Sequence, residues 1–253
     1  MSGTRTAVVT GASAGIGAAI ARALGALGWP VALGARRTPL LQEVGRDVEA
    51  AGGRAFSHVL DVTDAVSIDA FFGTAEQALG PIDVVVSNAG IGRPGLLHEV
   101  PIAELEHEIR TNLLGPMLVA RRALPAMLER RRGDLVFVSS MNVVEPRPFQ
   151  LGYTASKAGV EGMAQVLRRD LEGTGVRSTI VRPGATRSEF GFGWEPDILV
   201  RVLDAWKQWG FMRHLDMMGG DQVALAVVAA VTAPPGLHMD VIQVSPERRV
   251  GGD

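Results

Sequence analysis

The chain has 253 residues, of which 47% are hydrophobic and 21% charged, a composition typical of a single globular domain. It contains no cysteine, which excludes disulfides, zinc–thiolate sites and thiol nucleophiles and favours a reducing, cytoplasmic setting. The net charge of −2 does not favour binding to nucleic acid, and no apolar run approaches the ~18 residues that a membrane span needs. The first ten residues lack the basic and apolar regions of a signal peptide.

Short β-branched runs alternate with Ala- and Leu-rich stretches along the chain. The runs predict strands at residues 6–10, 31–33, 55–59, 83–87, 135–139, 177–181 and 241–244. The longer stretches predict helices near residues 15–28, 39–51, 64–79, 101–115, 116–131, 152–173 and 216–231. The strands are almost continuously apolar, as in sheets covered on both faces. The sequence therefore predicts a single α/β domain over residues 1–253, with a Rossmann-type, doubly wound, mainly parallel sheet flanked by helices.

Residues 184–216 interrupt this alternation, because they contain no predicted strand. They hold six of the thirteen aromatic residues of the chain, which are Phe190, Phe192, Trp194, Trp206, Trp209 and Phe211. Long interruptions of this kind are often functional lids, and binding pockets are mostly apolar. We therefore expect a substrate lid over a hydrophobic ketone or alcohol, although the cluster also fits a plain core. Arg187 and Arg213 leave an acidic substrate open.

A glycine-rich turn joins the first predicted strand to the first predicted helix. Gly11 allows a tight turn, Gly15 allows a pyrophosphate to approach the backbone, and Gly17 allows the helix to pack closely on the sheet. The helix N-terminus then offers free N–H groups and a partial positive charge to phosphates. A glycine cluster alone is a weak signal, but its strand–turn–helix context favours a dinucleotide site.

The end of the second predicted strand indicates which dinucleotide binds. A unit that binds NAD carries an acidic residue about 20 residues after the glycines, which holds the ribose 2′-hydroxyl. Here no Asp or Glu occurs before Glu43, and the strand ends instead in Arg36 and Arg37. Guanidinium groups make charge-assisted bonds to a 2′-phosphate. The sequence therefore favours NADP(H) over NAD(H), although the two arginines also fit a solvated helix start.

Tyr153 and Lys157 are four residues apart, so they share one face of the predicted helix. A nearby ammonium favours the phenolate and lowers the pKa of a tyrosine, which makes the pair a candidate acid/base. Ser140 follows a buried strand and could donate a hydrogen bond to a carbonyl oxygen that gains negative charge. A surface pair is the ordinary interpretation of such spacing, but Tyr153 is the only tyrosine of the chain.

Together these motifs resemble those of the short-chain dehydrogenase/reductase family over residues 6–244. The motifs are the glycine loop 10–17, Asn88-Ala89-Gly90, Asn112, Ser140, the Tyr153–Lys157 pair and Pro183-Gly184. The resemblance implies a catalytic tetrad of Asn112, Ser140, Tyr153 and Lys157, in which Asn112 holds a water of a proton relay. It also implies cofactor contacts from Gly11, Ser13, Gly15, Ile16, Gly17, Arg36, Arg37, Asp61, Val62, Asn88, Ala89, Gly90, Tyr153, Lys157, Pro183, Gly184, Thr186 and Ser188.

The expected function is hydride transfer between NADP(H) and a small-molecule carbonyl or secondary alcohol. The alternatives are a non-catalytic dinucleotide-binding sensor or scaffold of the same fold and an NAD-linked alcohol oxidation enzyme. The resemblance also implies a homo-oligomer, a dimer or tetramer, through the helices at 116–132 and 151–173. The five histidines lack metal-ligand spacing, so no metal site is expected, and neither nucleic acid nor a membrane is an expected partner.

Overall fold

The computed structural model describes residues 3–188, 193–211 and 216–248. Phe190, Phe192 and Arg213, which the sequence assigned to a lid or to substrate contacts, lie outside these ranges.

Within the described residues, seven strands form one sheet in the order β3-β2-β1-β4-β5-β6-β7, and all neighbouring pairs are parallel. The strands are β1 (Ala7–Thr10), β2 (Pro30–Ala35), β3 (Arg54–Val59), β4 (Val84–Ser87), β5 (Gly133–Val138), β6 (Val176–Pro183) and β7 (Val241–Val244). The order reverses between β1 and β4, and ligands bind such sheets at the carboxyl ends of the strands beside this reversal. The predicted doubly wound sheet is confirmed.

The helices follow the strands in the predicted alternation. They are α1 (Gly15–Gly25), α2 (Thr38–Ala50), α3 (Ala65–Leu79), α4 (Ile102–Ile109), α5 (Gly115–Glu129), α6 (Leu151–Asp170), α7 (Pro196–Gln208) and α8 (Gly220–Thr232). Local chemistry sets several of their ends. The Asp64 side chain accepts a hydrogen bond of 3.0 Å from the Val66 amide at the start of α3, and Gly80, with φ of 87°, ends that helix.

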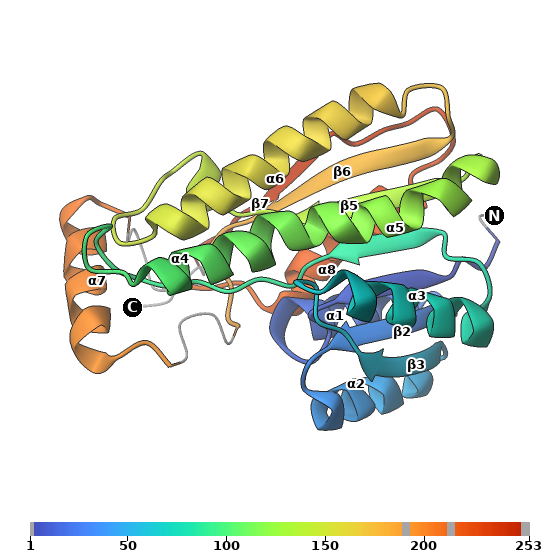
Figure 1. Cartoon of the computed structure of the whole chain (residues 1–253), viewed down its shortest axis with the longest axis horizontal. Helices are drawn as coiled ribbons and strands as arrows, with labels where there is room; N and C mark the ends of the chain where they lie inside the picture. Colours follow the sequence, from blue (N-terminus) through green and yellow to red (C-terminus); the bar gives the residue numbers. More distant parts are fainter. Residues whose placement is uncertain (1–2, 189–192, 212–215, 249–253) are drawn as a thin grey trace.

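Two hydrophobic cores cover the two faces of the sheet. One contains buried side chains of α1, α2 and α8, and the other contains those of α3, α5 and α6, as the layers in Figure 1 show. Along β1, Ala7 and Val9 belong to the first core and Val8 to the second. Because both faces of the central strands are buried, the strands read as continuous apolar runs rather than alternating ones.

Three elements differ from the prediction. The helices expected at 101–115 and 116–131 form one continuous run, because a π-helical turn, η1 (Arg110–Leu114), joins α4 to α5. The last helix starts at Gly220 rather than near residue 216, because the Gln222 side chain accepts a hydrogen bond from the Gly219 amide and fixes the start there. The 184–216 interruption contains α7, which stands at one end of the molecule in Figure 1.

Candidate active site

The loops after β1 and β4 are tied together where the strand order reverses. Thr10 Oγ1 accepts hydrogen bonds of 3.0 Å from the amides of Asn88 and Ala89, and the Asn88 side-chain amide donates one of 3.0 Å to the Thr10 carbonyl oxygen. Gly11 has φ of 65°, and a Cβ on it would lie 2.8 Å from the Ala89 Cα. Only glycine therefore fits at position 11. Thr10, which belongs to the motif, is a further candidate site residue to which no role was assigned from the sequence.

The N-terminus of α1 lies open to an anion at this place. Its N-cap residue, Ala14, offers no side-chain hydrogen bond, so the first amides of the helix are not satisfied by a cap. A Cβ on Gly17 would clash with the Gly11 carbonyl and with the Asn88 amide, so the helix packs directly on both loops. Unfilled amides and a positive helix end fit the pyrophosphate of a dinucleotide.

The arginines after β2 lie beside this cradle. Arg37 donates hydrogen bonds to Ser13 Oγ of the glycine loop, 3.3 Å from Nε and 3.0 Å from NH2. Burial acts to raise the pKa of Asp61, but hydrogen bonds from Thr63 and the charge of Arg36 outweigh it and hold that pKa below its ordinary value. Asp61 is therefore an anion engaged by its own loop, while Asp64 caps α3.

The segment that follows β6 lies near the N-terminus of α1. The Gly184 amide donates to the Val244 carbonyl at 2.8 Å, and Thr186 Oγ1 donates to the Gly184 carbonyl at 3.0 Å. Thr186 also pairs with Met218 in an isolated parallel bridge, just before α8 begins. A Cβ on Gly220 would lie 3.1 Å from the Gly15 carbonyl oxygen, so the start of α8 lies against the glycine loop. Residues 184–188, which include the assigned Ser188, thus lead from β6 to this border.

The candidate catalytic side chains lie together near the carboxyl end of β5. Lys157 is buried, and its Nζ donates a hydrogen bond of 2.8 Å to the Val138 carbonyl and lies 5.8 Å from the centre of the Tyr153 ring. Ser140 hydrogen-bonds Tyr153, and its Oγ accepts from the Asn142 amide at 3.2 Å. The structure therefore brings Ser140, Tyr153 and Lys157 together.

Asn112 lies in the π-helical turn and is fully buried. Its Oδ1 accepts a hydrogen bond of 2.8 Å from the Ile91 amide, and its Nδ2 donates to the Ile91 carbonyl at 2.8 Å and to Ser156 Oγ at 3.2 Å. A Cβ on Gly90 would lie 3.3 Å from Asn112 Oδ1 and 3.5 Å from Lys157 Nζ. The turn thus links the β4 loop to α6, and π-turns are frequent at functional sites.

Burial controls the ionisation of Tyr153 and Lys157. Burial raises the pKa of Tyr153 to about 12, with a lowering contribution from the Ser140 hydrogen bond and a raising one from the Glu108 charge. Burial also lowers the pKa of Lys157 to about 8, against the charge of Glu108. The Tyr–Lys spacing predicted a lowered tyrosine pKa. For the protein groups alone that prediction is wrong, because desolvation of the phenolate dominates.

Glu108 is a buried acid that sequence reasoning missed. It lies on α4 one turn before Asn112 and is 0% exposed. Its Oε1 accepts a hydrogen bond of 3.0 Å from the Arg93 amide, and burial raises the pKa of Glu108 to about 7. In sequence it stands among Glu104, Glu106 and His107, a pattern typical of a solvated helix face, so no local signal marks it.

Aromatic side chains of the 184–216 segment contact the loops that lead into the site. Trp194 Nε1 donates to the Gly92 carbonyl at 3.2 Å, and Trp206 Nε1 of α7 donates to the Pro148 carbonyl at 3.0 Å. The Arg147 guanidinium stacks 4.8 Å from the centre of the Trp206 ring. Trp209, in contrast, is 69% exposed. The segment is therefore hydrogen-bonded to two loops, one before Ser140 in the sequence and one after it.

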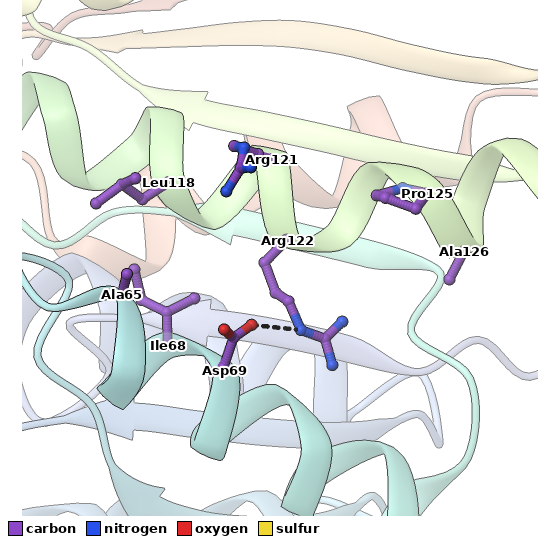
Figure 2. Close-up of a pocket in the computed structure, with 8 residues that line it drawn as sticks. All are labelled: Ala65, Ile68, Asp69, Leu118, Arg121, Arg122, Pro125 and Ala126. Carbon is purple, nitrogen blue, oxygen red and sulfur yellow. Dashed lines mark ion pairs between the residues drawn. The ribbon is translucent and has the colours of Figure 1, made fainter.

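A surface groove lies away from the candidate active site. Figure 2 shows it between α3 and α5, with Arg122 paired to Asp69 at 3.1 Å. Its volume is about 430 Å³, and no residue of the candidate active site lines it. Among the described residues no group of acidic or histidine side chains could hold a metal ion, and no helix of that part of the chain is long and apolar enough to cross a membrane.

Known proteins are similar to this chain in sequence and in fold. A short chain dehydrogenase of Pseudocercospora fijiensis (strain CIRAD86) is 38% identical over 192 residues, which make up 74% of this chain and 61% of that protein. For three curated relatives the aligned segments make up 61%, 19% and 63% of their length, so the chain spans less than two thirds of each.

Two solved structures cover nearly the whole chain. An alcohol dehydrogenase from the archaeon Thermococcus sibiricus, complexed with 5-hydroxy-NADP, has a TM-score of 0.81 and 29% identity and covers 95% of this chain and 96% of its own. A metagenomic short-chain oxidoreductase in complex with NADP has a TM-score of 0.80 and 35% identity, with 96% and 98% covered. The family model for short chain dehydrogenases matches residues 5–197, and the chain therefore belongs to the short-chain dehydrogenase family.

Proposed function

We propose that this protein is an NADP(H)-dependent oxidoreductase that interconverts a carbonyl compound and a secondary alcohol, with Tyr153 as the general acid and base. The observation that carries the proposal is the cluster of the buried Ser140 and Lys157 with the partly buried Tyr153 at the carboxyl end of the sheet, next to an uncapped helix N-terminus. The solved relatives that contain NADP or a derivative of it support the choice of a nicotinamide dinucleotide.

The cofactor-binding residues are those that form the cradle. The amides of Gly15, Ile16 and Gly17 would hold the pyrophosphate, and Asp61 and Val62 would lie at the adenine. Arg36 and Arg37 would bind a 2′-phosphate, since Arg37 already lies on Ser13 of the glycine loop and both side chains are exposed. When bound, the dinucleotide supplies the hydride for reduction or accepts it in oxidation.

Proton transfer belongs to the protein. The high pKa of Tyr153 keeps its hydroxyl protonated near neutral pH, which suits a general acid in carbonyl reduction. Ser140 would orient the substrate oxygen through a hydrogen bond, and Lys157 would hold a positive charge that stabilises the phenolate as it forms. Asn112 fixes the π-turn and, by resemblance to the family, would hold a water of the proton relay.

The substrate in this proposal is a small molecule with an apolar body. Trp194 and Trp206 both have their N–H groups hydrogen-bonded to loops near the site, so neither ring presents an unpaired N–H group to a substrate. Arg187 keeps an acidic substrate open. The proposal includes a homo-oligomer through α5 and α6, where Met117, Leu128 and Val166 are exposed. It also includes a cytoplasmic setting, which the absence of cysteine supports.

The test is turnover with defined substrates. The purified protein is assayed for oxidation of NADPH and of NADH against aliphatic, aromatic and polycyclic ketones and against keto acids. We expect NADPH-dependent reduction of apolar ketones. Tight NADPH binding without turnover of any ketone or keto acid would contradict the enzyme proposal and favour a dinucleotide-binding sensor or scaffold. Reduction of keto acids alone would contradict the apolar pocket.

A further inference from the structure

The carboxyl group of Glu108 lies directly behind the helix that carries Tyr153 and Lys157. Glu108 is fully buried on α4, and its carboxyl group faces Gly152 near the N-terminus of α6. A Cβ on Gly152 would clash with Glu108 Oε2, so the glycine before Tyr153 leaves the space that the carboxyl group fills. The acid therefore abuts the first turn of the catalytic helix.

The hydrogen bonds of this carboxyl group are incomplete. Oε1 accepts from the Arg93 amide at 3.0 Å, whereas Oε2 is buried and has no hydrogen-bond partner among the described residues. Burial of a polar group without a partner costs free energy, and such groups in folded proteins often have a functional role. Nothing in the proposed reaction so far uses Glu108.

Charged and titratable groups from three neighbouring segments act on Glu108. The loop after β4 contributes Arg93, α4 itself contributes Glu104, which pairs with Arg93 at 2.7 Å, and α6 contributes Lys157 and Tyr153. Burial outweighs the favourable effects of the Arg93 amide, the Arg93 charge and the Lys157 charge and raises the pKa of Glu108 to about 7. Glu108 therefore changes charge near neutral pH.

We propose that Glu108 is a positioning residue that acts through Lys157 and Tyr153, because its buried carboxylate stabilises the Lys157 ammonium and the protonated Tyr153 hydroxyl. Both effects follow from one negative charge held at a fixed place beside the buried Lys157 and the partly buried Tyr153. The carboxyl group lies beside the first turn of α6, where the positive end of the helix favours the carboxylate. Near pH 7 to 8 Glu108 and Lys157 titrate as a coupled pair rather than independently, while Tyr153 stays protonated.

The consequence for catalysis rests on the proposed function. Carbonyl reduction needs Tyr153 protonated and Lys157 charged, and Glu108 favours both states above its own pKa. Loss of the carboxylate should therefore let Lys157 lose its proton at a lower pH, and the alkaline limb of the rate profile should move with it. A purely structural Glu108 would change the rate by the same factor at every pH.

The direct test does not need turnover. The lysines of the chain are Lys157 and the exposed Lys207, so protein with ¹³C-labelled lysine gives one signal of interest and one internal reference. We expect the Lys157 signal to titrate near pH 8 in the wild type and about one pH unit lower in Glu108→Gln, with Lys207 unchanged. Glu106→Gln, at an exposed position of the same helix, is the matched control. An unshifted Lys157 midpoint in folded Glu108→Gln would overturn the proposal.

A measurement on the wild type covers the case in which Glu108→Gln does not fold. The ¹³C carboxyl signal of Glu108 should titrate near pH 7, and the Lys157 signal should show an inflection at the same pH. A Glu108 midpoint near the ordinary value of 4.5, or no inflection, overturns the proposal.

The activity arm separates this inference from the proposed function. With an active ketone, kcat/KM against pH should lose its alkaline limb about one pH unit earlier in Glu108→Gln than in the wild type and in Glu106→Gln. A limb at an unchanged pH in an active enzyme would overturn the role of Glu108 alone. Absence of turnover in the wild type would contradict the proposed function, while the lysine titration would still decide the inference.

Discussion

Gly152 and Glu108 fit against each other so closely that a methyl group on the glycine would overlap with Oε2 of the carboxyl group. One residue lies next to Tyr153 in α6, and the other lies one turn before Asn112 in α4. Gly152 leaves the space and Glu108 fills it, so the same contact lies beside Tyr153 on one helix and near Asn112 on the other. The absence of a side chain at position 152 is therefore a requirement of the site.

Gly152→Ala should destabilise the protein, because the added methyl group meets the fully buried carboxyl group of Glu108 and the side chain of Leu105. We expect a loss of about 1–3 kcal/mol in the free energy of unfolding, as for other overpacked sites. Urea denaturation measures this loss. The control is Gly73→Ala inside α3, where a Cβ would meet nothing within 4 Å, and where we expect a gain of roughly 0.5–1 kcal/mol. Equal stability of the two variants would contradict the tight fit.

Glu108 should make the stability of the fold depend on pH. Its pKa rises from 4.5 in the unfolded chain to about 7 in the fold, so between these values the folded state holds a proton that the unfolded state has lost. The free energy of unfolding should therefore fall as the pH rises from 4.5 to 7, by on the order of 3 kcal/mol from this group. Denaturation curves of wild type and Glu108→Gln across this range measure the difference. The same slope in both proteins would contradict the raised pKa.

A buried ion cluster joins β5, β6 and the segment just before β1. Asp134 of β5 pairs with Arg5, which precedes β1, at 2.5 Å and with Arg177 of β6 at 2.6 Å, and Asp134 is 4% exposed. Asp134→Asn would leave Arg5 buried without its counter-charge, so we expect a loss of about 3–5 kcal/mol in urea denaturation. Asp47→Asn, which breaks the exposed Arg22–Asp47 pair, should cost under about 1 kcal/mol. A cost as small for Asp134 would show that solvent reaches the cluster.

Binding measurements alone can test the proposal that Arg36 and Arg37 bind the 2′-phosphate. Arg36→Ala with Arg37→Ala should weaken NADPH binding by roughly 100-fold or more, since each of the two charge-assisted bonds contributes about 1.5–3 kcal/mol. NADH binding should change little, because NADH lacks the phosphate. Calorimetric titration of both dinucleotides measures the ratio, with Arg46→Ala at an exposed position of α2 as the control. An unchanged preference would contradict the assignment.

The sheet and the cradle were readable from the sequence because both depend on local patterns. Strands such as β1 are buried on both faces and leave an apolar run, while the turn from β1 into α1 needs glycine at positions where a Cβ would strike neighbouring backbone. The predicted members of the tetrad that follow β5 also lie together, since the serine ends a buried strand and the Tyr–Lys spacing matches one face of α6.

The parts that were not predicted depend on tertiary packing. The helix sequence around Glu108 gives no sign that one of its acids is buried, because burial results from how α4 meets Gly152 on α6. The raised pKa of Tyr153 is also a property of the packed site, since spacing along a helix reveals a neighbouring charge but not the loss of water around the phenol. The π-turn at Asn112 was not predicted either, because it also depends on tertiary packing.

The central proposal is that Tyr153 transfers the proton, and Tyr153→Phe tests it most directly. The variant removes one hydroxyl group and keeps the aromatic ring. With NADPH and a ketone that the wild type reduces, kcat should fall at least about 100-fold, as for loss of a general acid, while NADPH affinity stays within about twofold. Turnover at a rate close to that of the wild type, with cofactor bound equally well, would contradict the assignment of Tyr153 as the acid.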